Sequence, residues 1–319
     1  MRLTEGTQGP WAGVLGHPVG HSLSPVMHRA AYQVLDVGIR YGSEDVEESA
    51  LADTVLPALR DPSWRGFSVT MPLKSEAIRF ADRLTGFAQK VGVINTLARV
   101  GDPAQENQAG GEGRVLGHNT DVAGIVNALS LTGLSAGPDP RAAIVGGGGT
   151  ATAAAAALHV LGAARCTVFV RDESRAHRVA DVADRIGMDL DFEPLDRAPE
   201  RLKDFDHVVS TLPARAFDEY APNIAGDLGG TAVLDVSYDP WPSELSTAVE
   251  ARGGTAVSGR EMLLYQAVDQ IKLFVGQSLV EDLPHQQDVI SAMASALGLP
   301  ARTFVPRTVC DDALLQPRR

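Results

Sequence analysis

Four consecutive glycines, residues 146–149, follow a short apolar segment and open an alanine-rich stretch. Gly146, Gly148 and Ala151 therefore have the spacing G-x-G-x-x-A at the junction of an expected strand and an expected helix. The first glycine of such a junction allows a tight turn, the second lets the backbone approach a pyrophosphate, and the small third residue permits close packing. Free N–H groups at the helix start favour an anion. The pattern predicts a dinucleotide site that includes Gly149; the alternative is a purely structural turn.

The end of the next expected strand, residues 166–170, bears on which dinucleotide binds. Arg171 follows that strand directly, and Arg175 comes one helical turn later. Two arginines can bind a ribose 2′-phosphate, which favours NADP. Asp172 and Glu173 lie between them and would repel a phosphate, so NAD remains possible. The other alternative is a solvated helix start of mixed charge.

The composition sets limits on the function. The chain has 319 residues, 44% of them hydrophobic, and a formal net charge of −12, so we expect a globular protein of about two domains with no nucleic-acid or membrane partner. No secretory leader and no apolar run long enough to span a membrane are recognised, and a cytoplasmic location is expected. The cysteines, Cys166 and Cys310, suggest neither a disulfide nor a metal site, and Cys166 is expected to be buried.

Strands and helices alternate along the whole chain, which predicts an α/β fold. A helix is expected from Ser24 to Leu35, with Ser24 as its N-cap and Pro25 in its first turn. A second helix is expected directly after Pro72, with Lys74 in its first turn. Residues 101–113 are read as a hairpin-like loop. The other expected elements are strands at 12–16, 39–46, 67–71, 93–99, 142–145, 166–170, 207–211 and 232–237, and a helix at 261–274.

Five further strings of polar residues occur at points where the chain leaves an expected element. Together with the glycine loop, their order and spacing resemble those of shikimate dehydrogenases over about residues 12 to 276. The match is specific because several separate motifs recur at compatible spacings. The strings occupy residues 16–28, 66–74, 91–97, 117–124 and 259–266.

The resemblance implies roles for individual residues. Lys74 and Asp121 match the catalytic pair, in which the lysine supplies a proton and the carboxylate orients the lysine ammonium and shares in the proton transfer; a surface salt bridge is the alternative. Tyr238 matches a tyrosine near the substrate and the nicotinamide, although core packing would explain it nearly as well. The other residues matched to substrate binding are Ser22, Ser24, Thr70, Asn95 and Gln266, and those matched to cofactor binding are Thr211, Gly259 and Met262.

The implied reaction is the reversible, nicotinamide-dependent reduction of 3-dehydroshikimate to shikimate. The sequence departs from the family pattern without losing a catalytic group: Arg29 and Ser68 stand where asparagine is common, and Val93 where alanine is usual. Two alternatives remain open, namely a quinate or aminoshikimate dehydrogenase that uses NAD, and a dinucleotide-sensing regulatory module. The presence of both Lys74 and Asp121 speaks against the sensor.

The expected architecture is an N-terminal α/β substrate domain and a Rossmann-type dinucleotide-binding domain, with a cleft between them. Residues 1–121 and 259–298 are expected to form a discontinuous substrate-binding and catalytic domain, and residues 122–258 the nucleotide domain. Residues 299–319 are expected to be a loose tail. A small-molecule substrate, no bound metal, and a monomer or homodimer complete these expectations.

Overall fold

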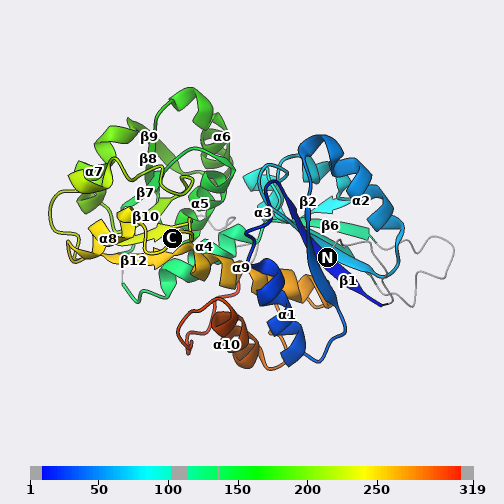
Figure 1. The fold of residues 1–319 in the computed structure, drawn as a ribbon. Helices are drawn as coiled ribbons and strands as arrows, with labels where there is room; N and C mark the ends of the chain where they lie inside the picture. Colours follow the sequence, from blue (N-terminus) through cyan, green and yellow to red (C-terminus); the bar gives the residue numbers. More distant parts are fainter. Residues whose placement is uncertain (1–8, 102–113, 135–136, 310–319) are drawn as a thin grey trace. The chain divides into compact units, whose positions relative to one another are not determined.

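A computed structural model describes residues 9–101, 114–134 and 137–309 (Figure 1). Within these residues the chain forms two compact units. The first comprises the chain up to Thr120 together with the chain from Gln266 onward, and the second is Asp121–Tyr265. Each unit is built on its own six-stranded sheet. No helix among the described residues is long and apolar enough to cross a membrane.

The sheet of the first unit has the strand order β2-β1-β3-β5-β6-β4. β1 runs parallel to β2 and β3, whereas β5 runs antiparallel to both β3 and β6. The strands are β1 (Trp11–Gly16), β2 (Arg40–Asp45), β3 (Trp64–Val69), β4 (Arg83–Leu84), β5 (Thr96–Val100) and β6 (Arg114–His118). The helices of this unit are α1 (Ser24–Val34), η1 (Glu48–Ala50), α2 (Leu51–Arg60), η2 (Glu76–Phe80), α3 (Gly86–Val91), α10 (Gln286–Ala296) and the C-terminal part of α9 (Gly259–Phe274).

Apolar side chains cover both faces of this sheet. On one face, Trp64 and Phe67 of β3 belong to a buried cluster that includes Leu51 and Val55 of α2. On the other face α9 approaches β3 so closely that a Cβ at Gly66 would lie 2.1 Å from Phe274 Cε1. Glycine at this position therefore lets α9 lie directly on the strand, and α9 carries Gln266 and Gln270 to the sheet.

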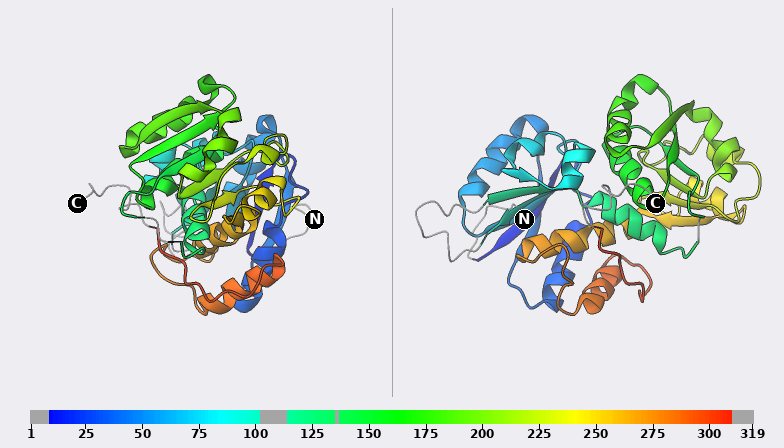
Figure 2. Two further views of the ribbon diagram at one scale, coloured as in Figure 1. Left: turned by 90° about the vertical axis from the view of Figure 1, so that its left-hand side faces the viewer. Right: turned by 180° about the vertical axis from the view of Figure 1, so that it is seen from behind.

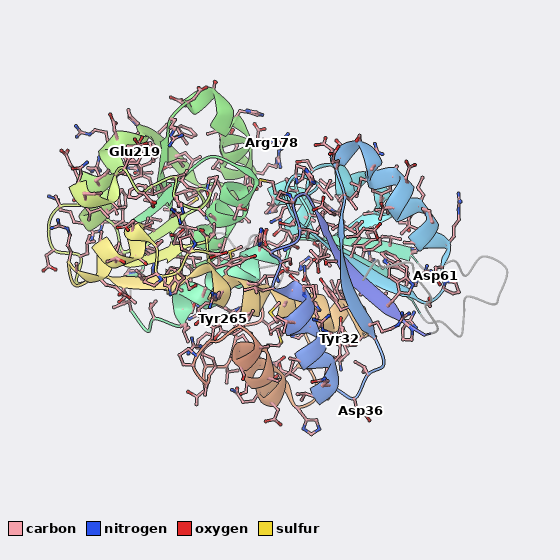
Figure 3. The ribbon with its side chains drawn as sticks, viewed as in Figure 1. Tyr32, Asp36, Asp61, Arg178, Glu219 and Tyr265 are labelled. Atoms are coloured by element: carbon pink, nitrogen blue, oxygen red, sulfur yellow. The ribbon has the colours of Figure 1, made fainter. Side chains whose placement is uncertain are left out.

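An aromatic group packs between α1 and this second face. The ring of His28 stacks on Tyr41 of β2 with 3.9 Å between centroids, and Tyr32, which Figure 3 labels, meets His28 edge-on. Burial lowers the pKa of His28 to about 3, so this histidine is neutral in the fold. The group anchors α1 and holds the side chain of Tyr41 in one orientation.

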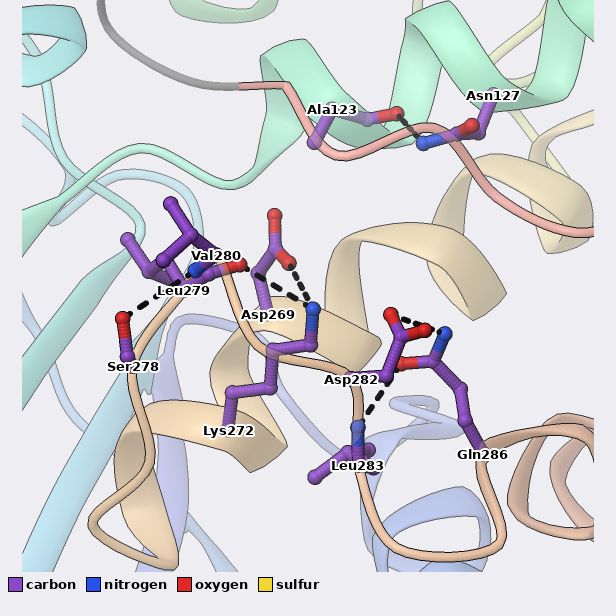
Figure 4. A network of polar contacts seen from close by, with 10 residues as sticks. All are labelled: Ala123, Asn127, Asp269, Lys272, Ser278, Leu279, Val280, Asp282, Leu283 and Gln286. Atoms are coloured by element: carbon purple, nitrogen blue, oxygen red, sulfur yellow. Dashed lines mark hydrogen bonds and ion pairs between the residues drawn. The ribbon is translucent and has the colours of Figure 1, made fainter.

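The loop after α9 is held by a buried lysine. Lys272 Nζ donates to the backbone oxygen of Leu279 at 3.2 Å and lies 4.0 Å from Asp269 Oδ1 (Figure 4). Burial raises the pKa of Asp269 to about 6, and the nearby Lys272 ammonium opposes that rise. Each side chain thereby offsets part of the cost of burying the other.

The second unit has the doubly wound order β12-β11-β10-β7-β8-β9, with every neighbouring pair parallel. α4, α5 and α6 line one face (Figures 1 and 2), and a cluster that contains Leu195, Phe205 and Leu245 is buried on the sheet as well. The strands are β7 (Ala142–Val145), β8 (Arg165–Val170), β9 (Asp189–Pro194), β10 (His207–Ser210), β11 (Ala232–Asp235) and β12 (Thr255–Ser258). The helices are α4 (Asp121–Ser130), α5 (Gly149–Val160), η3 (Glu173–Ala176), α6 (His177–Ile186), η4 (Leu195–Arg197), α7 (Ala198–Arg201), η5 (Leu202–Asp204), η6 (Ala221–Asn223), α8 (Glu244–Glu250) and the start of α9.

The predicted α/β fold is confirmed, and Cys166 is buried as expected. Two local predictions are wrong. Ser24 is the first residue of α1, and the N-cap is Leu23, which has near-helical backbone angles and an apolar side chain that cannot accept a hydrogen bond. No α-helix begins directly after Pro72: Lys74 lies in a turn that leads into the 3₁₀ helix η2.

Strand ends also differ from the predictions by a few residues. β3 ends at Val69, and β5 begins at Thr96, so Asn95 precedes its strand. Residues 299–309 contain no helix or strand. Most of the predicted 101–113 hairpin and the predicted tail from Cys310 onward lie outside the described residues.

Candidate active site

Strand direction brings the predicted substrate-binding residues of the first unit to one edge of its sheet. β1 and β3 are parallel, and Leu15 pairs with Val69 near their C-terminal ends. β5 runs the opposite way, so its first residue, Thr96, lies at the same edge, and it pairs there with His118 at the end of β6. The segments that continue from these strands carry Ser22, Ser24, Thr70, Lys74, Asn95 and Thr120.

Backbone hydrogen bonds fix the turn that carries Thr70 and Lys74. The N–H of Thr70 donates to Leu15 O at 2.9 Å, and the carbonyl of Lys74 accepts from the N–H of Ile94 at 3.1 Å. A Cβ at Gly16 would lie 2.3 Å from Thr70 Cγ2, so only glycine lets the end of β1 approach Thr70 this closely. The turn is therefore held from both neighbouring segments.

Asn95 lies at the centre of a buried group of amide and hydroxyl side chains. Its Oδ1 accepts from the N–H of Thr120 at 2.9 Å, and its Nδ2 donates to Thr120 Oγ1 at 2.8 Å. Gln266 of α9 joins the group, since its Oε1 accepts from Thr120 Oγ1 at 2.9 Å and from Asn95 Nδ2 at 3.3 Å. The structure thus brings together Asn95 and Gln266, which are 171 residues apart in the chain.

The two predicted carboxylate-binding serines lie at the start of α1. Ser22 Oγ accepts from the N–H of Ser24 at 3.3 Å, so the hydroxyl that meets the helix start belongs to Ser22. Ser24 is 5% exposed, whereas Ser22 is half-buried. An accessible hydroxyl beside a helix N-terminus suits a carboxylate ligand.

In the second unit, the glycine loop lies at the point where the strand order reverses, between β7 and β10. Gly146 follows β7 with φ +108°, a left-handed conformation that favours glycine. Thr211 follows β10, and its N–H and Oγ1 donate to Val145 O at 2.8 and 3.1 Å. Ligands of open α/β sheets bind at such a switch point.

The start of α5 leaves room for a ligand backbone. A Cβ at Gly148 or Gly149 would meet no atom within 4 Å, and no side chain caps the helix. Ala151 is fully buried in the same helix and provides the close packing expected of the third fingerprint position. The loop therefore fits the pyrophosphate of a dinucleotide.

Arg171 lies at the carboxyl end of β8, where the adenosine ribose of a dinucleotide is bound in this fold. Its side chain is 62% exposed, and its guanidinium lies 3.6 Å from Glu219 Oε1; Figure 3 labels Glu219. The Asp172 carboxylate forms hydrogen bonds within its own turn, since its Oδ1 accepts from the N–H and the Oγ of Ser174. Arg175 lies on the short helix η3, one turn after Arg171.

Tyr238, Gly259 and Met262 follow the ends of β11 and β12. Burial raises the pKa of Tyr238, which is half-buried. A Cβ at Gly259 would lie 2.1 Å from Val236 O, so glycine lets α9 start against the β11 loop. Asp235 anchors that loop, because its Oδ2 accepts from Ser243 Oγ at 2.7 Å and its Oδ1 from the N–H of Ser237.

In the chain as described, no group of three or more His, Cys, Asp or Glu residues could hold a metal ion.

Residues 14–97 match the family model of the shikimate dehydrogenase substrate-binding domain. A shikimate dehydrogenase (NADP(+)) of Desulfitobacterium hafniense is 33% identical over 257 residues, which cover 80% of this chain and 89% of the relative. The chain belongs to the shikimate dehydrogenase family. The family resemblance and the fold expected from it are therefore confirmed.

Solved structures of shikimate dehydrogenases agree over nearly the whole chain. The enzyme of Mycobacterium tuberculosis superposes with a TM-score of 0.75 at 34% identity and covers 90% of this chain and 99% of its own. The Mycobacterium fortuitum enzyme gives 0.73 at 38% identity, covering 91% and 98%. A Thermus thermophilus enzyme, solved in complex with NADP(H) and shikimate, gives 0.71 at 28% identity, covering 90% and 99%.

One residue of this family member's polar group was missed from the sequence. Thr120 bonds both Asn95 and Gln266 and is completely buried. Thr120 stands directly before Asp121 in the string 117–124. Its position beside a predicted catalytic residue is the feature of the sequence that could have pointed to it.

Proposed function

We propose that this shikimate dehydrogenase family member catalyses the reversible reduction of 3-dehydroshikimate to shikimate with NADPH. One observation carries the proposal: the polar residues matched to substrate binding, Thr70, Asn95 and Gln266, belong to one sheet edge and its hydrogen-bonded partners. Relatives that share about a third of the sequence are named shikimate dehydrogenase (NADP(+)). These names support the main interpretation. They give no support to a quinate dehydrogenase or to a sensor.

The roles proposed for the substrate-side residues follow from their chemistry. Ser22 and Ser24 would bind the substrate carboxylate, and Thr70, Asn95 and Gln266 its ring hydroxyls and carboxylate. Amides and hydroxyls both donate and accept, so they suit a polyhydroxylated ring.

Lys74 is proposed as the proton donor and Asp121 as its catalytic partner. NADPH, when bound, supplies the hydride that reaches the carbonyl carbon. The oxygen of that carbonyl then gains negative charge, and the Lys74 ammonium can neutralise it by transferring a proton. In the reverse direction the neutral amine takes the proton back from the substrate hydroxyl. Tyr238 would lie near the reacting groups.

The residues around the glycine loop would hold NADP. Gly146, Gly148, Gly149 and Ala151 would receive the pyrophosphate, with Thr211 beside them. Arg171 and Arg175 would bind the 2′-phosphate, which is why NADP is preferred over NAD. Gly259 and Met262 would face the nicotinamide end. For location and assembly, we propose that the enzyme is cytoplasmic and is a monomer or a homodimer.

Turnover with purified protein tests the function directly. Shikimate, quinate and aminoshikimate are each offered with NADP and with NAD, and the absorbance of the reduced nicotinamide is followed. We expect the highest kcat/KM with shikimate and NADP. Equal kcat/KM for quinate and shikimate would contradict the assigned substrate, and absence of turnover with every pair, despite NADP binding, would support the sensor instead.

A further inference from the structure

A continuous row of buried polar side chains leads from β2 to Asn95. Tyr41 OH lies 2.6 Å from Ser68 Oγ, and Ser68 Oγ lies 2.8 Å from Gln270 Oε1. Gln270 Nε2 lies 3.0 Å from Thr96 Oγ1, which lies 2.9 Å from Asn95 Oδ1. All five residues are buried, so each polar group needs a protein partner.

Fixed backbone groups determine which way the two amides point. The N–H of Thr120 can only donate, so the Asn95 atom that it meets must be Oδ1. The carbonyl of Asn95 can only accept, so the Gln270 atom 3.2 Å from it must be Nε2. Neither amide can rotate by half a turn without placing two donors or two acceptors face to face.

The hydroxyl groups then have only one consistent direction. Gln270 Oε1 accepts, so Ser68 must donate to it, and Ser68 can only receive the proton of Tyr41. Thr96 Oγ1 accepts a hydrogen bond from Gln270 Nε2 and donates one to Asn95 Oδ1. Burial raises the pKa of Tyr41, and the stacked His28 holds its ring, so Tyr41 stays a protonated donor in a fixed place.

The direction continues beyond Asn95 to the second amide of the site. Asn95 Nδ2 donates a hydrogen bond to Thr120 Oγ1, and Thr120 Oγ1 in turn donates one to Gln266 Oε1. The orientation of both amides matched to substrate binding is thereby linked to one set of buried donors. An amide turned the wrong way would offer a substrate hydroxyl the wrong hydrogen-bonding atom.

We propose that Tyr41, Ser68 and Gln270 are positioning residues that, together with the backbone N–H of Thr120, hold the amide of Asn95, and through Thr120 that of Gln266, in the orientation needed for substrate recognition. The inference rests on the proposed function. Ser68 is the central link because it accepts from Tyr41 and donates to Gln270. Ser68 also stands where the family commonly has asparagine. The hydrogen-bonded row from Tyr41 through Ser68, Gln270 and Thr96 to Asn95, called the relay below, therefore belongs to the present chain.

Ser68→Ala, Ser68→Thr and Tyr41→Phe test the relay. Ser68→Ala removes the donor to Gln270, so we expect KM and Kd for shikimate to rise about five- to tenfold, the loss of one buried hydrogen bond, while kcat and the KM for NADP change less than about twofold. Ser68→Thr keeps the hydroxyl and should restore KM. Tyr41→Phe leaves Ser68 able to donate, so its effect should be the smaller one.

A matched control separates positioning from lost stability. Ser246 is a buried serine of the second unit whose Oγ donates to Ser243 O at 2.8 Å. Ser246→Ala should lower Tm without a change in the KM for shikimate. If Ser68→Ala lowers Tm but leaves the KM and Kd for shikimate unchanged, Ser68 is merely structural and the proposal is overturned.

A second measurement does not depend on activity. In the wild type, the side-chain NH₂ signals of Gln270 and Asn95 should exchange slowly with water in ¹H–¹⁵N spectra, and Ser68→Ala should accelerate both. Unchanged exchange in the variant would refute the relay. If the wild type does not turn over shikimate but Ser68→Ala still accelerates this exchange, the proposed function is refuted and the relay stands.

Discussion

A Cβ at Gly146 would lie 2.7 Å from Thr211 Oγ1, which is bonded to the end of β7. Gly146 also has φ +108°. Gly146→Ala should therefore be strained in two ways, and we expect a loss of about 1–3 kcal/mol of stability together with weaker NADP binding. Unfolding in urea and titration of NADP by calorimetry measure the two effects.

Gly148→Ala is the matched control. A Cβ at Gly148 meets no protein atom within 4 Å, and its φ is −82°. This variant should keep the wild-type unfolding midpoint while NADP binds about tenfold more weakly, because the methyl group occupies space that a pyrophosphate needs. Wild-type NADP affinity in Gly148→Ala would place the dinucleotide elsewhere.

The features predicted correctly from the sequence are local. The glycine loop is a short strand-turn-helix segment, and its spacing alone locates Gly146, Gly148 and Ala151. The N-cap of α1 was missed because Ser22 and Ser24 both lie close to its start, and only the backbone angles place Leu23 at the cap. The helix predicted after Pro72 was wrong because backbone contacts from Leu15 and Ile94 hold the segment in a turn instead.

The assembly of the site depends on long-range pairing. The hydrogen bond between Asn95 and Gln266 requires the antiparallel placement of β5 beside β3 and the close packing of α9 at Gly66. No spacing rule reports a strand order or the approach of a helix 171 residues away. The motif resemblance named both residues, but the relay through Ser68 and Gln270 became visible only in the structure.

Asp269 gives the stability a pH dependence that can be measured. Its pKa in the fold is about 6, above its ordinary value of 3.8, because the carboxyl group is buried. Folding therefore favours the protonated form, and this contribution is fully present below about pH 4 and lost as the pH rises through 6. The full contribution is about 3 kcal/mol.

Asp269→Asn removes this titration and keeps the size of the side chain. The stability of the wild type relative to Asp269→Asn should therefore fall between pH 4 and 7, as measured by urea unfolding at each pH. A difference that stays constant over this range would mean that the Asp269 pKa is the same in the folded and unfolded chains.

Arg171→Ala should change the choice of cofactor. The Arg171 side chain is 62% exposed, and a 2′-phosphate would compete with Glu219 for its guanidinium, so loss of Arg171 should raise the KM for NADP about tenfold, the effect of one charge-assisted hydrogen bond. The KM for NAD should not change. Arg165→Ala is the control, because Arg165 lies at the opposite end of the same strand and is 70% exposed. Equal increases for NADP and NAD would show that Arg171 does not bind the phosphate.

Lys74→Ala should lower kcat for shikimate oxidation by about 10²- to 10⁴-fold, the usual contribution of a general acid–base group, with a smaller change in KM. Lys74→Arg keeps the positive charge but gives up a proton poorly, so its kcat should stay low while substrate affinity largely recovers. Lys203→Ala alters an exposed lysine of the second unit and serves as the control. Stopped-flow kinetics with saturating NADP would resolve the chemical step. A wild-type rate for that step in Lys74→Ala would remove this lysine from proton transfer, and recovery of the rate by Lys74→Arg would reduce its role to charge alone.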